Sequence, residues 1–556
     1  MKERFGSIPA ATGQPKPLTN GDKIITKFAS ISPTYCPILK INIQKKMSSV
    51  KISAGRTLRV PRNLPSHFLA ASRTQRAIRG VANALLAALL LTFGGTISAG
   101  VADVSSPKTV VPEKKPDANP LCFADGTICI DIQERIRFEA RENTFDFNED
   151  VTALNDDIFV LNRFRVGLAF KPVDWLKFYA QGQDAHEWFS DRPNIPGVLG
   201  AEGDDNFDLR QAYVQVGRKD LNFTAGRQVL QYGDERLIGP AEWTNFSKTF
   251  DAGKFHYEQP KFSIDLFAST PVYIFRDSFD QSDLFNGAET HRNSVFTGAY
   301  ASTTAIQPMT LDFYALYLHE DNTVPLPTTL TAVTYPGTTL SIPGTSTDFV
   351  TLGTRVKSDP KKLHGWEYDG EFAFQAGQVS NLDLLACALH AGGGYTFQNC
   401  PWKPRLYLEY NYATGDGDPT DGDIGTFQNL FPSNHNKYGV MDLFAWENLS
   451  SPDVRFKVQP FKQLSLETAF YSYWLADTND SWYRANGTTR VRPLTPAARA
   501  ASSYAGSEID LLVTYQPVKF LNIWAGYSHF FAGDYLNATG ASDDADFGYV
   551  QLTFNF

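Results

Sequence analysis

Arginines recur at every second position in two neighbouring stretches of this sequence, DIQERIRFEAR (131–141) and FVLNRFRVGLAF (159–170). A guanidinium group keeps its positive charge and binds a carboxylate through two parallel N–H···O bonds. Arginines on one face of adjacent strands can therefore form a strip that attracts anionic solutes. The candidates for this solute conduit are Arg135, Arg137, Arg163, Arg165, Arg355, Arg405 and Arg455.

Carboxylates fall on the same face as these arginines, which leaves a second interpretation open. Arginine–carboxylate ladders can brace a wet protein wall without binding any solute. The acidic residues that the period places there are Glu139, Glu367, Asp369, Glu371, Glu409, Glu467, Glu508 and Asp510. The number of arginines favours an electropositive strip, whereas these acids reduce its field.

A second candidate site is a long connection that is dense in charges and aromatic rings, YGDERLIGPAEWTNFSKTFDA (232–252). Its length and composition suit a loop or gate at the conduit. The candidate gate residues are Asp234, Glu235, Arg236 and Trp243.

Acidic residues also cluster in TGDGDPTDGD (414–423). Carboxylate oxygens suit Ca²⁺, but the spacing misses the helix-loop-helix calcium pattern, so a solvated turn is the preferred interpretation. The weak calcium candidates are Asp416, Asp418, Asp421 and Asp423. No Cys/His spacing matches a metal site, and we expect no cofactor.

Two classes of function are disfavoured by composition. The chain has nine histidines, and no motif pairs one with a nucleophile as hydrolytic enzymes require, so we expect no enzyme of the phospholipase or protease kind. The net charge is −9, and the basic residues are concentrated near the start of the chain. The remaining, strongly acidic part is a poor partner for nucleic acid.

The elements that must position these residues are strands. In YVQLTFNF (549–556) apolar and polar residues alternate strictly, which indicates a strand with one apolar and one polar face. Such strands recur from residue 130 onward, separated alternately by tight turns and long connections. The strands predicted are 130–141, 157–170, 174–187, 207–217, 221–230, 248–258, 261–270, 292–303, 309–319, 347–357, 366–378, 382–397, 403–412, 450–458, 464–474, 506–516, 521–532 and 547–556.

This pattern predicts an all-β, membrane-spanning, antiparallel up-and-down barrel of about 18 strands in the outer membrane of a bacterium. Eight tight turns would lie on one side and nine long connections on the other. Charged residues should point into the lumen, because a charge facing lipid costs about 2–4 kcal/mol at mid-membrane. Phe556 should close the last strand against the first, and it resembles the terminal aromatic signal read by the barrel-assembly machinery.

The region before the barrel predicts export. A basic stretch, the apolar run VANALLAALLLTF (81–93) and a small-residue segment follow one another, which is typical of a signal peptide cut near Ala102. We divide the chain into a basic extension (1–72), signal peptide (73–102), periplasmic tether (103–129) and barrel (130–556). Since Met47 is the only other methionine before the signal, a mis-assigned start is one explanation of the extension.

Cysteines offer one plausible bridge. Cys122 and Cys129 flank a possible turn at Asp125-Gly126, and export to an oxidising compartment would allow a disulfide. A Cys387–Cys400 pair is disfavoured, because an extended run separates the two residues.

Three segments carry a resemblance to a known family. They are GRQVLQYGDERLIGPAEWTNFSKTFDA (226–252), DPTDGDIGTFQNLFPSNHNKYGVMDLF (418–444) and GSEIDLLVTYQPVKFLNIWAGYSHFFAGDYL (506–536). Together they resemble the alginate-export family of outer-membrane barrels over roughly residues 130–556. The resemblance implies an 18-strand barrel whose arginine-lined pore passes an anionic polysaccharide. A general or small-solute porin is the alternative function.

Overall fold

The structure, a computed structural model, describes residues 121–150, 156–191, 203–276, 278–284, 293–321 and 346–556. The predicted basic extension and signal peptide, and the tether up to residue 120, lie outside the described residues. Most of the described chain is β-strand. The helices within it are short, and none is long and apolar enough to cross a membrane.

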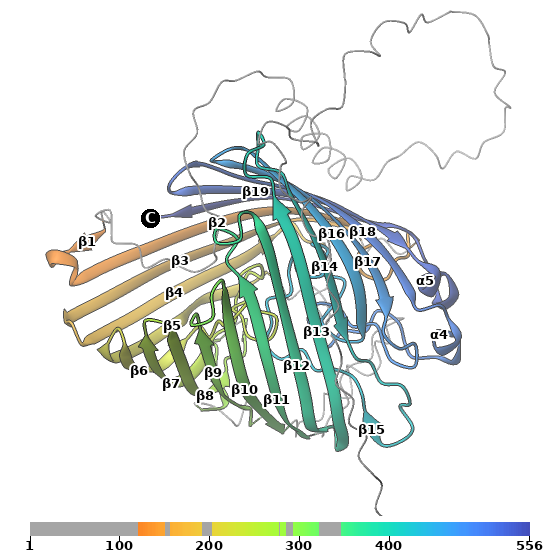
Figure 1. Ribbon diagram of the computed structural model, residues 1–556, viewed down its shortest axis with the longest axis horizontal. Helices are drawn as coiled ribbons and strands as arrows, with labels where there is room; N and C mark the ends of the chain where they lie inside the picture. Colours follow the sequence, from red (N-terminus) through yellow and green to blue (C-terminus); the bar gives the residue numbers. More distant parts are fainter. Residues whose placement is uncertain (1–120, 151–155, 192–202, 277, 285–292, 322–345) are drawn as a thin grey trace, which may run out of the picture. The chain divides into compact units, whose positions relative to one another are not determined.

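The strands form one closed antiparallel barrel (Figure 1). Of the 20 strands in the sheet, β1 (Cys122–Phe123) and β15 (Asp423–Ile424) have only two residues each. The other 18 build the wall. They are β2 (Ile128–Glu142), β3 (Asp157–Val173), β4 (Leu176–Trp188), β5 (Asp205–Arg218), β6 (Leu221–Gln228), β7 (Phe250–Gln259), β8 (Phe262–Pro271), β9 (Val295–Thr303), β10 (Met309–Asp321), β11 (Ser346–Ser358), β12 (Trp366–Val379), β13 (Leu382–Thr396), β14 (Arg405–Ala413), β16 (Leu449–Phe461), β17 (Leu464–Leu475), β18 (Tyr504–Val518), β19 (Leu521–Ala532) and β20 (Ala545–Asn555).

The connections follow the predicted alternation with one exception. Every connection predicted to be tight is short, and the opposite side of the barrel carries most of the long ones. Between β12 and β13, however, a connection expected to be long consists of Ser380 and Asn381 alone. Both have positive φ, 55° and 64°, as a two-residue hairpin turn of type I′ requires. We assign the side with the tight turns to the periplasm.

Alternation sorts the wall into two faces as the sequence predicted. Apolar side chains on the outer face are well exposed, for example Leu352 at 50% and Leu408 at 57%. Side chains this apolar form the lipid-facing band of a membrane barrel. Arginines and carboxylates on the alternate positions point inward, where they contact one another and the internal loops.

The seam between first and last strands is completed by Phe556. Its N–H donates to the carbonyl of Ile132 at 2.9 Å, and the Ile132 N–H donates back at 3.2 Å. The Phe556 ring is 53% exposed and stacks on Phe520, with ring centroids 5.7 Å apart. Residue 556 therefore closes the wall with its ring outward, as predicted.

The outer face is not uniformly apolar, contrary to the expectation that charges point inward. Asn162 donates a hydrogen bond to Glu134 across β2 and β3, and His186 Nε2 lies 3.1 Å from Asp184 on β4. These side chains share the parity of Phe164, which faces outward. Their mutual pairing lowers the cost of placing polar groups on this face.

Near the start of β2, Cys122 and Cys129 form a disulfide that ties β1 to β2. This bridge confirms the pairing suggested by the sequence. Cys387 is a free cysteine, so the disfavoured Cys387–Cys400 pair is not made.

Inside the wall, long connections pack into an aromatic core. Trp446 and Trp482 are fully buried, and Phe444 stacks on both Tyr473 and Trp482 with centroids 4.2 Å and 4.5 Å apart. Two short helices, α4 (Pro496–Ala500) and α5 (Asp534–Thr539), belong to the same side. This part of the barrel is thus filled by protein.

A candidate conduit with an arginine ladder and two lumen loops

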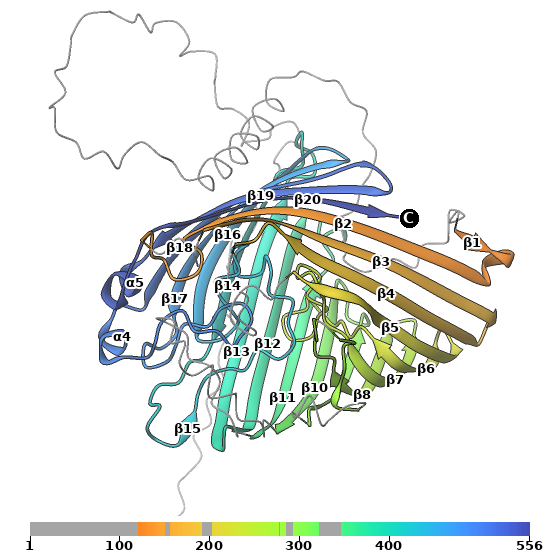
Figure 2. The same cartoon turned by 180° about the vertical axis from the view of Figure 1, so that it is seen from behind.

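Two long connections enter the barrel and meet there (Figure 2). Lumen loop 1 is residues 229–249, between β6 and β7, and lumen loop 2 is residues 414–448, between β14 and β16. The side chain of Asn245 in lumen loop 1 donates to the carbonyl oxygens of Asn162 and Gly203 at 2.9 and 2.8 Å. Lumen loop 1 is therefore attached to the wall at β3.

Five inward arginines hold lumen loop 1, and we call them the arginine ladder. They are Arg135 and Arg137 on β2, Arg163 and Arg165 on β3, and Arg210 on β5. The carboxylate of Glu242 accepts from three of them, at 2.9 Å from Arg163, 2.8 Å from Arg165 and 2.7 Å from Arg210. One loop carboxylate thus serves three guanidinium groups.

Arg135 binds the same loop through neutral acceptors. Its terminal nitrogens donate to the carbonyl oxygens of Glu242 at 2.6 Å and Thr244 at 3.0 Å, and to Asn245 Oδ1 at 2.8 Å. Arg137 donates to the Trp243 carbonyl at 2.6 Å and pairs with Glu139 at 2.6 Å. Four of the predicted conduit arginines are therefore brought together, but beneath a loop.

The arginine ladder and Glu242 differ in how far they are exposed to the lumen. Arg135, Arg137 and Arg163 are each only 2% exposed, whereas the Glu242 side chain is 45% exposed. Although partial desolvation of Glu242 opposes its ionisation, Arg165, Arg163 and Arg210 hold the pKa of Glu242 well below its ordinary value. Glu242 is therefore an anion that faces the lumen from the top of a positive cluster.

Trp243, a predicted gate residue, joins the two lumen loops. Its ring stacks on His435 with centroids 3.7 Å apart, and the Arg137 guanidinium carbon lies 3.6 Å from the Trp243 ring centre. The Tyr549 ring meets Trp243 edge-on at 4.9 Å. The indole is thus enclosed by one cation and two rings.

Backbone bonds make a second junction between the loops. Gly239 N–H donates to the Phe431 carbonyl at 2.8 Å, and Phe431 N–H donates to the Leu237 carbonyl at 2.9 Å. The Lys248 ammonium donates to the carbonyl of Pro432 at 2.8 Å, and burial lowers the pKa of Lys248 to about 8. The two lumen loops therefore form one continuous partition.

The other predicted gate residues lie on the opposite part of this partition. The Asp234 carboxylate forms ion pairs with Arg355 at 2.9 Å and with Lys357 at 2.6 Å. Burial alone would raise the pKa of Asp234, but these cations hold it below its ordinary value. Arg236 is 6% exposed and lies 4.0 Å from Glu371. Glu235 donates its N–H to Tyr232 at 3.0 Å within the loop.

The remaining predicted conduit arginines do not join the arginine ladder. Arg355 also pairs with Asp312 at 2.6 Å. Arg455 pairs with Glu409 at 3.0 Å and donates to the Asn436 carbonyl of lumen loop 2 at 2.9 Å. Arg405 pairs with Glu367 at 2.5 Å. These three are carboxylate-paired, which is the bracing arrangement foreseen as the alternative.

The acidic stretch 414–423 folds on itself. Asp416 Oδ1 accepts from the Asp418 N–H at 3.2 Å, and Asp421 Oδ1 accepts from the Asp423 N–H at 2.9 Å. Within the described ranges, the only three carboxylates that come within ligand distance of one another lie elsewhere, at Asp205, Asp208 and Asp280.

Several site residues were missed by sequence reasoning. Glu242 and Asn245 stand in the quoted loop, but nothing in the sequence shows that this loop binds the arginine ladder. Glu508, expected among the acids that neutralise the arginines, instead accepts from Val440 and Met441 N–H at 2.7 and 3.0 Å. Arg210 lies beside a break in the β4–β5 register, which shifts the alternation that parity relies on.

This architecture defines the class of protein: a porin-like outer-membrane β-barrel with a channel role and a lumen narrowed by its own loops. The particular family follows from sequence, because the alginate-export family profile matches residues 127–550 and the chain therefore belongs to the alginate-export family. A comparison with curated protein sequences finds no match.

Solved structures from Pseudomonas aeruginosa are similar to this chain. OccK11 (OpdR) has 12% identity and a TM-score of 0.46 over 77% of this chain and 96% of its own. OpdK, solved with vanillate, has 9% identity and a TM-score of 0.48 over 77% and 98%. OccK8 (OprE) has 11% identity and a TM-score of 0.48 over 77% and 98%.

Proposed function

We propose that this channel passes anionic solutes, with an anionic polysaccharide of the alginate type as its cargo. The observation that carries the proposal is the excess of guanidinium charge at the arginine ladder. Arg163, Arg165 and Arg210 share the single carboxylate of Glu242, while Arg135 is bound through carbonyl and amide oxygens.

Unsatisfied hydrogen-bond donors of the arginine ladder also support an anionic cargo. Within the described residues, four buried nitrogens of the arginine ladder have no hydrogen-bond partner: Nε of Arg135, Arg163 and Arg210, and Nη2 of Arg165. A buried N–H without an acceptor is costly. With lumen loop 1 displaced, carboxylates of a solute would supply such acceptors and would take the place of Glu242 at the same guanidinium groups.

A general or small-solute porin is the second candidate, and the partition favours it. Lumen loops 1 and 2 are joined by the Trp243–His435 stack and by the bonds around Phe431. A small anion needs less free space beside the partition than a polymer does. Both functions use the arginine ladder. They differ in the size of the solute that must fit between it and the rest of the lumen.

Reconstituted channels in a salt gradient test the proposal. The wild type should give a reversal potential that favours anions, and about 1 M salt should mute it because screening shortens to about 3 Å. Polyuronate chains added to one side should block the current, whereas uncharged dextran of the same length should not. Block by short uronates but not by the polymer would favour the small-solute porin. A cation-favouring wild-type channel would contradict the anionic cargo and leave a general porin as the function.

A further inference from the structure

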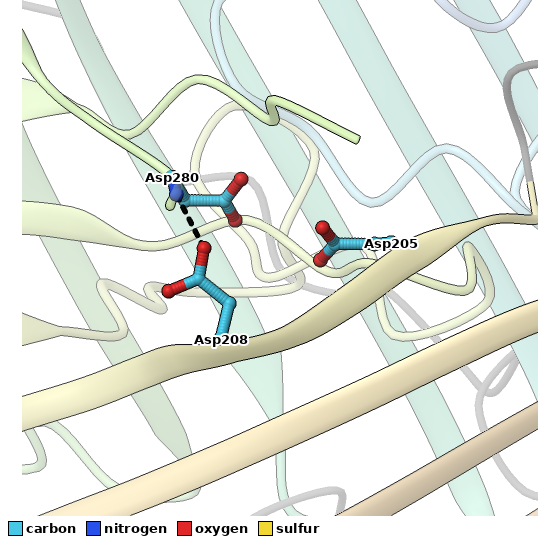
Figure 3. A group of neighbouring side chains, drawn as sticks. All are labelled: Asp205, Asp208 and Asp280. Atoms are coloured by element: carbon cyan, nitrogen blue, oxygen red, sulfur yellow. Dashed lines mark hydrogen bonds between the residues drawn. The ribbon is translucent and has the colours of Figure 1, made fainter. Parts of the chain in front are cut away.

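Three carboxylates that neither the arginine ladder nor the partition uses converge at the loop-side end of β5. One oxygen from each of Asp205, Asp208 and Asp280 lies within 4.8 Å of one oxygen from each of the others. Figure 3 shows the Asp205 carboxylate pointing toward the other two. Asp280 comes from the connection between β8 and β9, so the group links that connection to the wall.

A β-bulge explains how two residues of one strand share this site. Asp205 pairs with Ala185 and Asp208 pairs with Gln183, so three steps along β5 oppose two steps along β4. In a regular strand residues three apart point to opposite faces, whereas an extra residue restores them to the same face. Both aspartates are buried, with exposures of 1% and 4%.

The oxygens of Asp205 are the observation that points to a ligand. Both are buried, and neither has a hydrogen-bond partner among the described residues. Asp208 accepts from the N–H groups of Asp280 and Leu209, and Asp280 accepts from Phe275 N–H at 2.8 Å. An isolated buried carboxylate beside two others is strongly unfavourable unless a cation compensates it.

The arginines of this region are already committed to other carboxylates. Arg227 pairs with Asp251 at 3.0 Å, and Ser282 Oγ also donates to Asp251 at 2.6 Å. Arg276 forms an ion pair with Asp204. In the described part of the chain, no Lys, Arg or His side chain lies within ion-pair distance of Asp205, Asp208 or Asp280.

We propose that Asp205, Asp208 and Asp280 bind a divalent cation, with Ca²⁺ as the preferred ion. Carboxylate-only ligands suit hard cations. Ca²⁺ holds oxygens about 2.4 Å away, so ligands on opposite sides of it are about 4.8 Å apart. The three oxygens lie within this limit of one another, whereas Mg²⁺ usually keeps several waters and binds through only one or two carboxylates. The bound ion ties the β8–β9 connection to β5.

Calorimetry on the folded full-length barrel in detergent tests the site. After removal of metal with EDTA, CaCl₂ should bind at one site with a Kd of about 10⁻⁴–10⁻³ M, and MgCl₂ should bind more weakly. Asp205→Asn keeps the side-chain shape and should weaken Ca²⁺ binding by about tenfold or more. Asp280→Asn changes a loop residue outside the wall and should do the same, which guards against misfolding of the first variant.

Asp421→Asn in the acidic stretch 414–423 is the matched control and should leave Ca²⁺ binding unchanged. The melting temperature gives a second readout, because the difference between Asp205→Asn and the wild type should reverse between EDTA and CaCl₂. In EDTA, Asp205→Asn should melt at or above the wild-type temperature, because charge repulsion is relieved; in CaCl₂ it should melt below. Absence of saturable Ca²⁺ binding in the wild type, or equal binding by wild type and Asp205→Asn, would overturn the site and indicate a carboxylate kept neutral by protonation.

Discussion

Trp243 and His435 stack inside the barrel with ring centroids 3.7 Å apart and ring planes 3° from parallel. They belong to lumen loops 1 and 2, which leave the wall at β6–β7 and at β14–β16. Arg137 covers the indole at 3.6 Å, so the wall, lumen loop 1 and lumen loop 2 meet at one ring. Trp243 is thus the centre of one of the two junctions that hold the partition together.

Trp243→Ala should raise the single-channel conductance. The change removes an aromatic stack worth about 0.5–1.5 kcal/mol and a cation–π contact of similar size, which should loosen the junction between the lumen loops. Recordings in planar bilayers measure this effect. Trp175→Ala is the control, because Trp175 is 54% exposed beside a periplasmic turn. An unchanged conductance for Trp243→Ala would show that another contact limits the current.

Glu242→Gln should increase anion selectivity. The substitution removes the carboxylate that Arg163, Arg165 and Arg210 share but keeps the backbone carbonyls that Arg135 and Arg137 bind. The reversal potential in a salt gradient should therefore move further toward anions. Glu258→Gln, at a side chain 47% exposed near a periplasmic turn, should have a smaller effect.

The reverse change tests the arginine ladder itself. Replacing Arg135, Arg137, Arg163 and Arg165 together with Gln should move the reversal potential toward cations. Because these arginines also hold lumen loop 1, the conductance should rise in the same variant. If neither Glu242→Gln nor the quadruple variant shifts the potential, the arginine ladder is bracing, and the channel's selectivity arises elsewhere.

Sequence reasoning succeeded for most of the wall, where a period of two applies, although the outward Glu134 and Asp184 break the expectation that charges point inward. It predicted the wall strands, the inward arginines and the outward ring of Phe556, because alternation across a strand is a local property. It failed where the period breaks. The bulge in β5 turns Asp205 and Asp208 to one face, and Ser380-Asn381 closes a hairpin where a long connection was expected.

Contacts between distant segments were beyond sequence reasoning. Glu242 accepts a hydrogen bond from Arg210, and Trp243 stacks on His435, although the two residues of each pair are far apart in the chain. Nothing local fixes where a loop docks, since loops carry no period and many polar groups compete for the same partners. The alginate-export resemblance implied an arginine-lined pore. In the structure, however, the predicted conduit arginines lie under lumen loop 1 or pair with carboxylates.

The partition should tighten as pH rises from about 8. Burial lowers the pKa of Lys248 to about 8, and burial together with Arg236 lowers that of Lys437 to about 8. The folded state therefore holds these protons more weakly than the unfolded chain, whose lysines titrate near 10.5. The free energy of unfolding should rise between these pH values, by at most about 1.4 kcal/mol per pH unit for each lysine.

Lys248→Met tests this pH dependence, since it removes the charge and keeps an unbranched side chain. Heat denaturation between pH 7 and 10 should show a smaller rise in stability for this variant than for the wild type. Lys362→Met, at a side chain 51% exposed on a periplasmic turn, should leave the slope unchanged. A wild-type slope that Lys248→Met does not alter would mean that Lys248 is already compensated when charged.

Phe556→Asp should impair assembly of the barrel. The residue exchanges backbone hydrogen bonds with Ile132 across the seam and stacks its ring on Phe520. A carboxylate there would keep the backbone bonds but place a charge at the lipid boundary and remove the ring through which we propose that the assembly machinery recognises the strand. Fractionation and a heat-modifiable band on semi-native gels measure the folded fraction.

Two further arms separate recognition from stability at this position. Phe556→Leu keeps an apolar group and loses the ring, so a low folded fraction in cells for this variant would indicate that the aromatic ring itself is recognised. Purified Phe556→Leu refolded into detergent should then form the barrel as readily as the wild type, because the seam hydrogen bonds to Ile132 need no side chain. Wild-type amounts of folded Phe556→Asp in cells would show that neither the ring nor an apolar boundary is required there.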